Sequence, residues 1–243
     1  EIVMAEIKPE IQIVMPVHNE EECIEAVLDE LYDELSPRLS IQFVVSEDCS
    51  QDRTKQILKE LSHRLPMILI MDEQQKGYSQ AVADAYRATT SDYILALDSD
   101  GQCSPKDFWT FYQDRDKFDI SMGWRRPRSD TLFRRVLSGG FKAIYQMLFR
   151  VPLHDPSCPY LLITKEVRDA VVKDMGTFSH GFWWEFFARA HTKGFKIREI
   201  PIQHRTRLAG HTKSYPLASL PGIAITHVSG LFRIWQQVRK DSR

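Results

Sequence analysis

Cysteine is scarce in this sequence, and an excess of charge of one sign is lacking. The four cysteines among 243 residues, Cys23, Cys49, Cys103 and Cys158, are widely spaced and form neither a CxxC pair nor a close cluster with histidines. This spacing disfavours a zinc site or a disulfide scaffold and favours a reducing compartment. The 32 basic residues are balanced by 33 acidic residues, which argues against binding nucleic acid through a wide basic face. We therefore expect no nucleic-acid partner.

Long apolar runs are also lacking. Residues 1–10 carry charges and have no apolar centre, which is not the pattern of a signal peptide. The longest weakly polar stretch, residues 217–232, contains Pro221, His227 and two glycines. It falls short of the roughly 20 apolar residues that a membrane-spanning helix needs. The sequence therefore predicts a cytoplasmic protein that does not cross a membrane.

The first hundred residues alternate between short apolar runs and amphipathic helical patterns. This alternation is typical of βαβ units and predicts an α/β fold with a Rossmann-like, mostly parallel sheet flanked by helices. The hydrophobic fraction of 43% is enough for a buried core. Strands are expected over residues 11–16, 41–46, 67–71, 93–97, 119–124, 161–164 and 195–201, and helices over 20–35, 52–65, 78–88, 105–114, 132–149 and 180–192.

Polar clusters follow each of the first four predicted strands. The carboxyl ends of strands in an open α/β sheet border the ligand crevice, so we expect these clusters to meet. Asp98 and Asp100 supply hard oxygen ligands, which suit Mg²⁺ or Mn²⁺ completed by substrate phosphates. Alone, this Asp, Ser, Asp sequence would equally be a solvated acidic turn, but its company favours a site for a metal-bound nucleotide. The clusters are Pro16 to Glu20, Ser46 to Asp52, Gln75 to Ala81 and Asp98 to Asp100.

With these motifs the chain resembles the inverting family 2 glycosyltransferases of GT-A fold, and within them the dolichyl-phosphate mannose synthase and polyprenyl-phosphate branch. The resemblance runs from residue 11 to about residue 215. It implies an opening motif against the nucleotide, an acidic pair on the base and ribose, a glycine that allows close approach, and a DxD motif that holds the metal. The matching residues are, in that order, Pro16, His18, Asn19 and Glu20; Glu47 and Asp48; Gly77; and Asp98 and Asp100, with Gln102 where the mannose synthase-like members also carry Gln.

The second half of the chain matches the same family. Asp155 and Pro156 correspond to its Asp, Pro element, although Cys158 and Pro159 replace the Ser, Gly that follows there. Arg53 stands where the family usually has Gly, and Glu47 keeps the charge of the commoner Asp with a longer reach. The signature of the polyprenyl-phosphate branch is matched at Pro201, Ile202, Arg207, Gly210, Thr212 and Lys213.

The resemblance implies transfer of a sugar from a UDP- or GDP-sugar, with loss of a diphosphate leaving group. A metal ion held by Asp98 and Asp100 would stabilise the growing charge on that group. Arg207 and Lys213 would add positive charge at the phosphates, or would simply form a solvated basic loop.

The acceptor decides whether a general base is needed. A polyprenyl phosphate is already an anion and needs none, and Arg134 and Arg135 could grip its phosphate. With Lys142 these arginines could equally form an ordinary charged helix face. A saccharide hydroxyl in glycan or cell-surface polysaccharide assembly would need a base, and Glu185 is the candidate by family position. A third interpretation, a non-catalytic nucleotide-sugar-binding module, is disfavoured by the intact acidic and basic residues.

The C-terminal stretch has a helical pattern over residues 220–238, with apolar residues on one face and a basic end. This pattern is typical of an interfacial helix on anionic lipid, and equally of a helix packed on its own domain or on a dimer partner. We expect a catalytic domain over residues 1–216, with a nucleotide-binding half to about 102 and an acceptor-binding half after it, and an amphipathic helix over 217–243 at the cytoplasmic membrane face. The residues of the pattern are Ile223, Val228, Leu231, Trp235 and Val238, with Arg233, Arg239 and Lys240.

Overall fold

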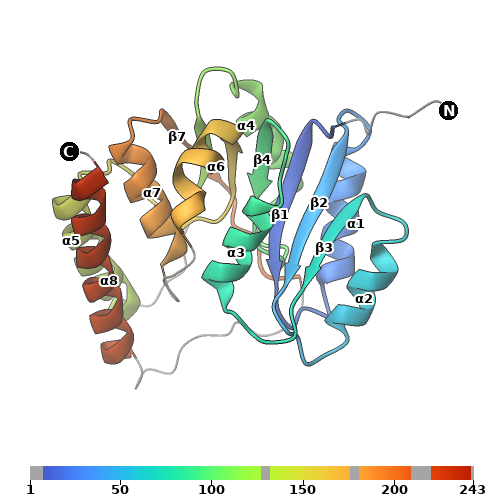
Figure 1. Ribbon diagram of the computed structural model, residues 1–243, viewed down its shortest axis with the longest axis horizontal. Helices are drawn as coiled ribbons and strands as arrows, with labels where there is room; N and C mark the ends of the chain where they lie inside the picture. Colours follow the sequence, from blue (N-terminus) through green and yellow to red (C-terminus); the bar gives the residue numbers. More distant parts are fainter. Residues whose placement is uncertain (1–7, 127–131, 176–180, 209–219, 242–243) are drawn as a thin grey trace.

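The computed structural model describes residues 8–126, 132–175, 181–208 and 220–241. Within these ranges, a seven-stranded sheet of order β3-β2-β1-β4-β6-β5-β7 runs through the centre of the molecule (Figure 1). The strands are β1 (Ile11–Val17), β2 (Ile41–Glu47), β3 (Met67–Met71), β4 (Tyr93–Ala96), β5 (Ile120–Arg125), β6 (Leu161–Thr164) and β7 (Ile197–Ile202).

The sheet is mostly parallel, which confirms the predicted fold class. Strand β1 pairs in parallel with both β2 and β4, and β2 pairs in parallel with β3. Strand β6 runs antiparallel to its neighbours β4 and β5, while β7 is parallel to β5. From β1 the chain adds β2 and β3 on one side of the sheet, and from β4 onward it adds strands on the other side. The place between β1 and β4 is therefore a topological switch point, where α/β sheets bind their ligands.

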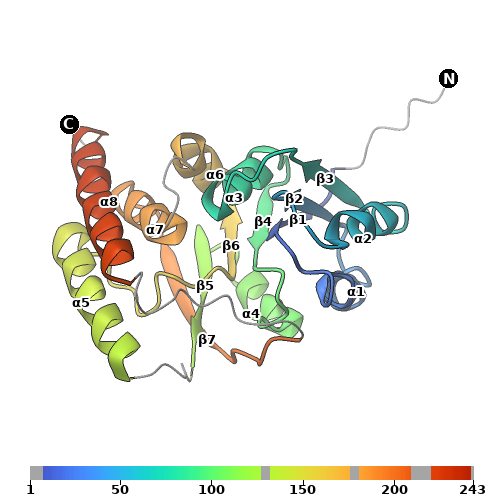
Figure 2. The same ribbon diagram turned by 90° about the horizontal axis from the view of Figure 1, so that it is seen from below.

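Helices cover both faces of the sheet. Figure 2 shows α1 and α4 on one face and α3 and α6 on the other, with α5 and α8 forming an outer layer beside α7. Within the described ranges, every helix is too short or too polar to span a lipid bilayer. The helices are α1 (Ile24–Leu35), α2 (Thr54–Leu61), α3 (Tyr78–Arg87), α4 (Phe108–Gln113), α5 (Leu132–Phe149), α6 (Lys165–Val171), α7 (Phe182–Thr192) and α8 (Leu220–Asp241), with 3₁₀ turns η1 (Pro105–Asp107) and η2 (Val172–Asp174).

Strand β1 lies at the centre of the core, and all seven of its residues are buried. Burying each of its aliphatic side chains contributes about 1.5–3 kcal/mol. Gln12 is the polar exception, and both the nitrogen and the oxygen of its amide are hydrogen-bonded. Its Nε2 donates to Gln42 Oε1 at 2.8 Å, and its Oε1 accepts from the backbone N–H groups of Thr90 and Ser91. The buried amide thereby ties β1 to β2 and to the turn before β4.

The first two helices start later than the sequence pattern predicts. The helix predicted from residue 20 begins at Ile24, and the one predicted over 52–65 spans Thr54–Leu61. The reason is local: Asp52 accepts from the N–H groups of Glu21 and Thr54, and the N–H of Glu20 donates to Thr54 Oγ1 at 2.8 Å. These bonds join the loops after β1 and β2 in place of a further helical turn.

The predicted C-terminal helix is present as α8. Leu231, Ile234 and Val238 are buried, and α8 contacts α5 and α7. In addition, Arg189 of α7 donates to Gln237 Oε1 at 2.6 Å. This part of the apolar face therefore packs on the protein itself, whereas Ile223 and Val228 lie among side chains outside the described part of the chain.

Candidate active site

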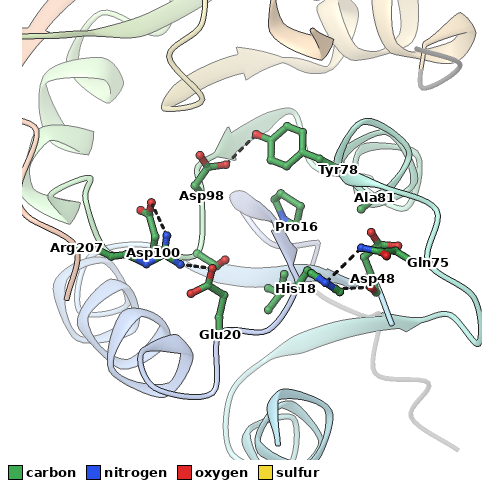
Figure 3. Close-up of a pocket in the computed structure, with 12 residues that line it drawn as sticks. Pro16, His18, Glu20, Asp48, Gln75, Tyr78, Ala81, Asp98, Asp100 and Arg207 are labelled. Carbon is green, nitrogen blue, oxygen red and sulfur yellow. Dashed lines mark hydrogen bonds and ion pairs between the residues drawn. The ribbon is translucent and has the colours of Figure 1, made fainter. Parts of the chain in front are cut away.

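A pocket of about 380 Å³ lies at the carboxyl ends of β1, β2 and β4 (Figure 3). It brings together residues that are far apart in the sequence, because parallel strands end at the same edge of the sheet. Residues of the opening motif, the acidic pair and the DxD motif meet there with Arg207. The lining residues are Pro16, Val17, His18, Glu20, Asp48, Gln75, Tyr78, Ala81, Asp98, Ser99, Asp100 and Arg207.

One end of the pocket is built from polar groups around His18 and Asp48. His18 Nδ1 donates to the backbone carbonyl of Asp48 at 2.7 Å, and because a carbonyl only accepts, Nδ1 carries the proton. His18 Nε2 is then an acceptor, and the amide groups of Asn19 and Gln75 donate to it at 3.1 and 3.3 Å. Both amides are fixed by this arrangement.

The loops after β1 and β2 hold each other in shape. Asn19 has a φ of 53°, a left-handed conformation that Asn tolerates better than most residues. Its N–H donates to Ser50 Oγ at 2.8 Å, and its Oδ1 accepts from the N–H of Gln51 at 2.7 Å. Asn19 thus shapes the pocket edge without being part of the described lining.

Asp48 orients the start of α3. Its two carboxylate oxygens accept from the backbone N–H groups of Lys76 and Gly77 at 2.6 and 2.9 Å. Gly77 has a φ of 89°, which L side chains rarely adopt, whereas a Cβ built there would meet nothing within 4 Å. In the protein alone, backbone conformation therefore explains this glycine, and the close approach to a nucleotide that the family resemblance implied stays a prediction.

The opposite end of the pocket is acidic. Glu20 and Asp100 both pair with Arg207, the latter at 3.7 Å. Burial raises the pKa of Asp98 to about 6, with a further contribution from the charge of Asp100. The described lining at this end therefore has more carboxylates than guanidinium groups, and it favours a cation.

Residues 205–208, which include Arg207, pack directly on the turn after β4. The N–H of Leu208 donates to the carbonyl of Asp100 at 3.3 Å, and the N–H of Gln102 donates to Asp100 Oδ1 at 3.0 Å. Gly101 has a φ of 72°, and a Cβ there would lie 2.4 Å from Leu208 Cδ1. Gln102 continues the contact, since its Nε2 donates to the carbonyl of Arg205 at 3.2 Å.

Tyr78 is a pocket residue that the sequence reasoning did not single out. Its hydroxyl donates to Asp98 Oδ1 at 2.8 Å and accepts from Trp183 Nε1 at 2.8 Å. The available signal was its place directly after Gly77, at the start of a predicted helix. Gln75 was likewise placed in a polar cluster but given no role.

The acidic end fits a divalent ion that arrives with phosphates. Among the described residues, no three His, Cys, Asp or Glu side chains gather to hold a metal by themselves. Asp98 and Asp100 supply two carboxylates to one pocket. Mg²⁺ is usually bound in this way, through one or two carboxylates plus substrate phosphates.

Two of the expected acidic site residues, Glu47 and Glu185, are not in the described pocket lining. Glu47 is fully buried, and its Oε1 accepts from the N–H of Ser50, so in the described structure it closes a turn behind the pocket. Glu185 is also buried and pairs with Arg189, whose Nε donates to its Oε1 at 2.9 Å. Burial raises the pKa of Glu185, partly offset by the charge of Arg189.

Asp155 has a partner that the sequence did not reveal. Arg125, at the end of β5, donates to both carboxylate oxygens of Asp155 at 2.7 and 2.9 Å. The pair is largely buried, and neither residue belongs to the described pocket lining. Arg134 and Arg135 lie on α5, but their side chains are outside the described part of the structure, and Lys213 lies outside the described residues.

Comparison with known families gives one extended match. A family model described as "Glycosyl transferase family 2" matches residues 12–172, about two thirds of the chain. This range contains β1 to β6 and most of the residues that line the pocket.

Similar curated proteins are longer than this chain. A dolichol-phosphate mannosyltransferase of Pyrococcus furiosus is 25% identical over 213 residues, covering 84% of this chain and 58% of that protein. Glycosyltransferase AglD of Haloferax volcanii is 24% identical, covering 94% and 37%. An undecaprenyl-phosphate 4-deoxy-4-formamido-L-arabinose transferase of Edwardsiella ictaluri is 25% identical, covering 84% and 62%. The chain thus spans between about a third and two thirds of these relatives.

Solved structures share the fold. Glucosyl-3-phosphoglycerate synthase from Mycobacterium tuberculosis, in complex with Mn²⁺, UDP-glucose and phosphoglyceric acid, superposes with a TM-score of 0.68 at 15% identity, covering 94% of this chain and 80% of that one. TarS of S. aureus superposes with a TM-score of 0.58 at 17% identity, covering 79% and 58%. At these identities the likeness shows a common architecture.

Proposed function

Because this chain belongs to glycosyl transferase family 2, we propose that it transfers a sugar from a nucleotide-sugar donor to a polyprenyl phosphate. The observation that carries the proposal is the two-ended pocket, with polar side chains around His18 at one end and the carboxylate pair of Asp98 and Asp100 at the other. A nucleoside suits the first end and a metal-bound diphosphate suits the second. The donor would therefore lie along the ends of β1 and β4.

Mg²⁺ or Mn²⁺ is the proposed cofactor, held by Asp98 and Asp100. When bound with the donor, the ion would neutralise charge on the departing diphosphate. The synthase structures that share this fold were crystallised with UDP and Mn²⁺ or Mg²⁺, which supports the proposal for the fold. In this chain the support is the excess of carboxylates at that end of the pocket.

Arg207 is proposed to complete the phosphate site. Its guanidinium group lies 3.7 Å from Asp100 Oδ2 and is paired with Glu20. Its guanidinium stays charged at all working pH values and can donate two hydrogen bonds to one phosphate. It would add fixed positive charge where negative charge develops on the leaving group. Lys213 remains a prediction for the same role.

A lipid phosphate is the acceptor that the known features favour. Two relatives carry names with dolichol-phosphate or undecaprenyl-phosphate in them. An anionic phosphate attacks without a general base, whereas Glu185, the candidate base, is buried in a pair with Arg189 and is not among the described pocket residues. Arg134 and Arg135 remain predictions for gripping the acceptor phosphate.

A peripheral contact with the membrane is part of this proposal, because the acceptor lipid is anchored there. Arg233, Arg239 and Lys240 are exposed on α8, and basic side chains near an anionic lipid surface each contribute about 1 kcal/mol of attraction.

The function is tested by offering a panel of labelled UDP- and GDP-sugars with a short polyprenyl phosphate, with and without Mg²⁺ or Mn²⁺. We expect metal-dependent label in the lipid phase from one of the donors. Label that goes only to water or to added saccharides would contradict the lipid acceptor and would favour the saccharide-hydroxyl alternative. Omitting the lipid in a parallel reaction controls for donor hydrolysis.

A further inference from the structure

Tyr78 connects three elements around the acidic end of the pocket. It is the first residue of α3, and its side chain reaches across to Asp98 after β4, as Figure 3 shows. The same hydroxyl group lies 2.8 Å from Asp98 Oδ1 and 2.8 Å from Nε1 of Trp183 on α7. The Tyr78 hydroxyl is therefore hydrogen-bonded both to the Asp98 carboxylate and to the indole of Trp183.

The direction of both hydrogen bonds follows from the donors available. An indole N–H can only donate, so the Tyr78 oxygen must accept from Trp183. A hydroxyl has one hydrogen, which is then left for Asp98 Oδ1. Trp183 thus fixes the rotation of the hydroxyl, and the hydroxyl fixes the carboxylate plane, which leaves Oδ2 of Asp98 as the oxygen for a cation.

Tyr78 is itself part of the pocket wall. The residue remains 40% exposed and lines the pocket together with Asp98. The hydrogen bond between these two side chains therefore lies within the site.

We infer that Tyr78 is a positioning residue for the metal-binding carboxylate of Asp98, with Trp183 setting the direction of its hydrogen bond. The inference rests on the proposed function, because it takes Asp98 as a ligand of the donor's metal ion. Groups that orient a metal ligand change metal affinity by about 10- to 100-fold when removed. A purely structural link between α3 and α7 would change the stability of the fold and leave metal affinity as it was.

The test is Mn²⁺ binding to the whole chain, measured by the electron paramagnetic resonance signal of free Mn²⁺ in the presence of UDP and, separately, GDP. Tyr78→Phe keeps the ring and removes the hydroxyl, and we expect the Kd for Mn²⁺ to rise about tenfold. Trp183→Phe removes the N–H that orients the hydroxyl and should raise the Kd in the same direction by a smaller factor.

Tyr93→Phe is the matched control. The Tyr93 hydroxyl also donates to a carboxylate, Asp116 Oδ1 at 2.9 Å, but neither residue lines the pocket. We expect this variant to bind Mn²⁺ as the wild type does. The thermal unfolding midpoint of every variant is recorded alongside, so that a loss of folded protein is separated from a loss of metal affinity.

The outcomes separate the inference from the proposed function. A wild type that binds Mn²⁺ with a nucleotide, together with a folded Tyr78→Phe variant of equal affinity, would overturn the role of Tyr78 and leave the proposed function standing. A wild type that binds no Mn²⁺ with either nucleotide would overturn the metal site and this inference with it. If Tyr78→Phe does not fold, unchanged Mn²⁺ affinity in Trp183→Phe would be the contradicting result.

Discussion

The two carboxylate oxygens of Asp100 have different contacts. One oxygen accepts from the N–H of Gln102, and the other lies 3.7 Å from Arg207. Asp100→Asn keeps the size and the accepting oxygen but removes the charge. We expect sugar transfer to fall by about 10²- to 10³-fold, as when one fixed electrostatic group is lost from a site. The rate is compared with that of Asp116→Asn, a surface change outside the pocket, and equal rates would contradict the role of Asp100.

Cys23 lies next to the acidic end of the pocket, and we expect its thiol to be unreactive. Burial and a hydrogen bond to Glu20 raise the pKa of its thiol to about 12. Because the thiolate is the reactive form, its fraction stays below about one thousandth up to pH 9. We expect iodoacetamide to label the partly exposed Cys49 of the native protein at pH 8 and to leave Cys23 unlabelled, as read by peptide mass spectrometry. Equal labelling of both would show that this part of the site opens.

At the residue scale, the sequence predicts which side chains meet when those side chains directly follow parallel strands. His18, Asp48 and Asp100 follow three separate strands, and the parallel sheet brings them into one pocket. The bonds of Tyr78 and Arg125 were not predictable in this way. Each depends on where a side chain points across a gap between elements, and a tyrosine at the start of a helix is as typical of packing as of a site.

Helices α7 and α8 are joined by a chain of polar side chains that runs from the buried Glu185 and Arg189 to the exposed Gln237. Glu185 pairs with Arg189, and Arg189 donates to Gln237 Oε1. A hydrogen bond to a charged group contributes about 1.5–3 kcal/mol. Gln237→Ala should therefore lower the amide-exchange protection of residues 229–241 by at least about tenfold, while Gln236→Ala, its exposed neighbour, should not. Equal protection in both variants would contradict the contribution of this link to the docking of α8.

Element boundaries were predictable where apolar pattern alone sets them. Residues 67–71, 132–149 and 161–164 were expected as β3, α5 and β6, and the structure has them at those bounds. The starts of α1 and α2 were wrong because Asp52 and Thr54 bind backbone groups of the neighbouring loop instead of extending a helix. Helix α6 was not predicted, since its seven residues carry too short a pattern.

At the scale of the whole molecule, the basic end of α8 should govern contact with membranes. We expect Arg239→Gln with Lys240→Gln to weaken co-sedimentation with anionic vesicles by about 30-fold, from about 1 kcal/mol for each lost charge. The matched control is Lys59→Gln with Lys117→Gln, two exposed lysines outside α8. Added salt should weaken the wild type toward the level of the α8 variant. Equal binding of the two double variants would contradict a contact through α8.

The contact between Leu208 and Gly101 also determines when the site is completed during synthesis of the chain. Strands β1 to β4, which lead to the acidic turn, are synthesised before the segment that carries Arg207. The segment that brings Arg207 to Asp100 leaves the ribosome only after about 100 further residues, a delay of roughly 5 to 20 s at ordinary rates of elongation. During that interval the nascent chain carries the carboxylates of Glu20, Asp98 and Asp100 without Arg207. Under the proposed function, the complete phosphate site would therefore exist only after translation has passed residue 208.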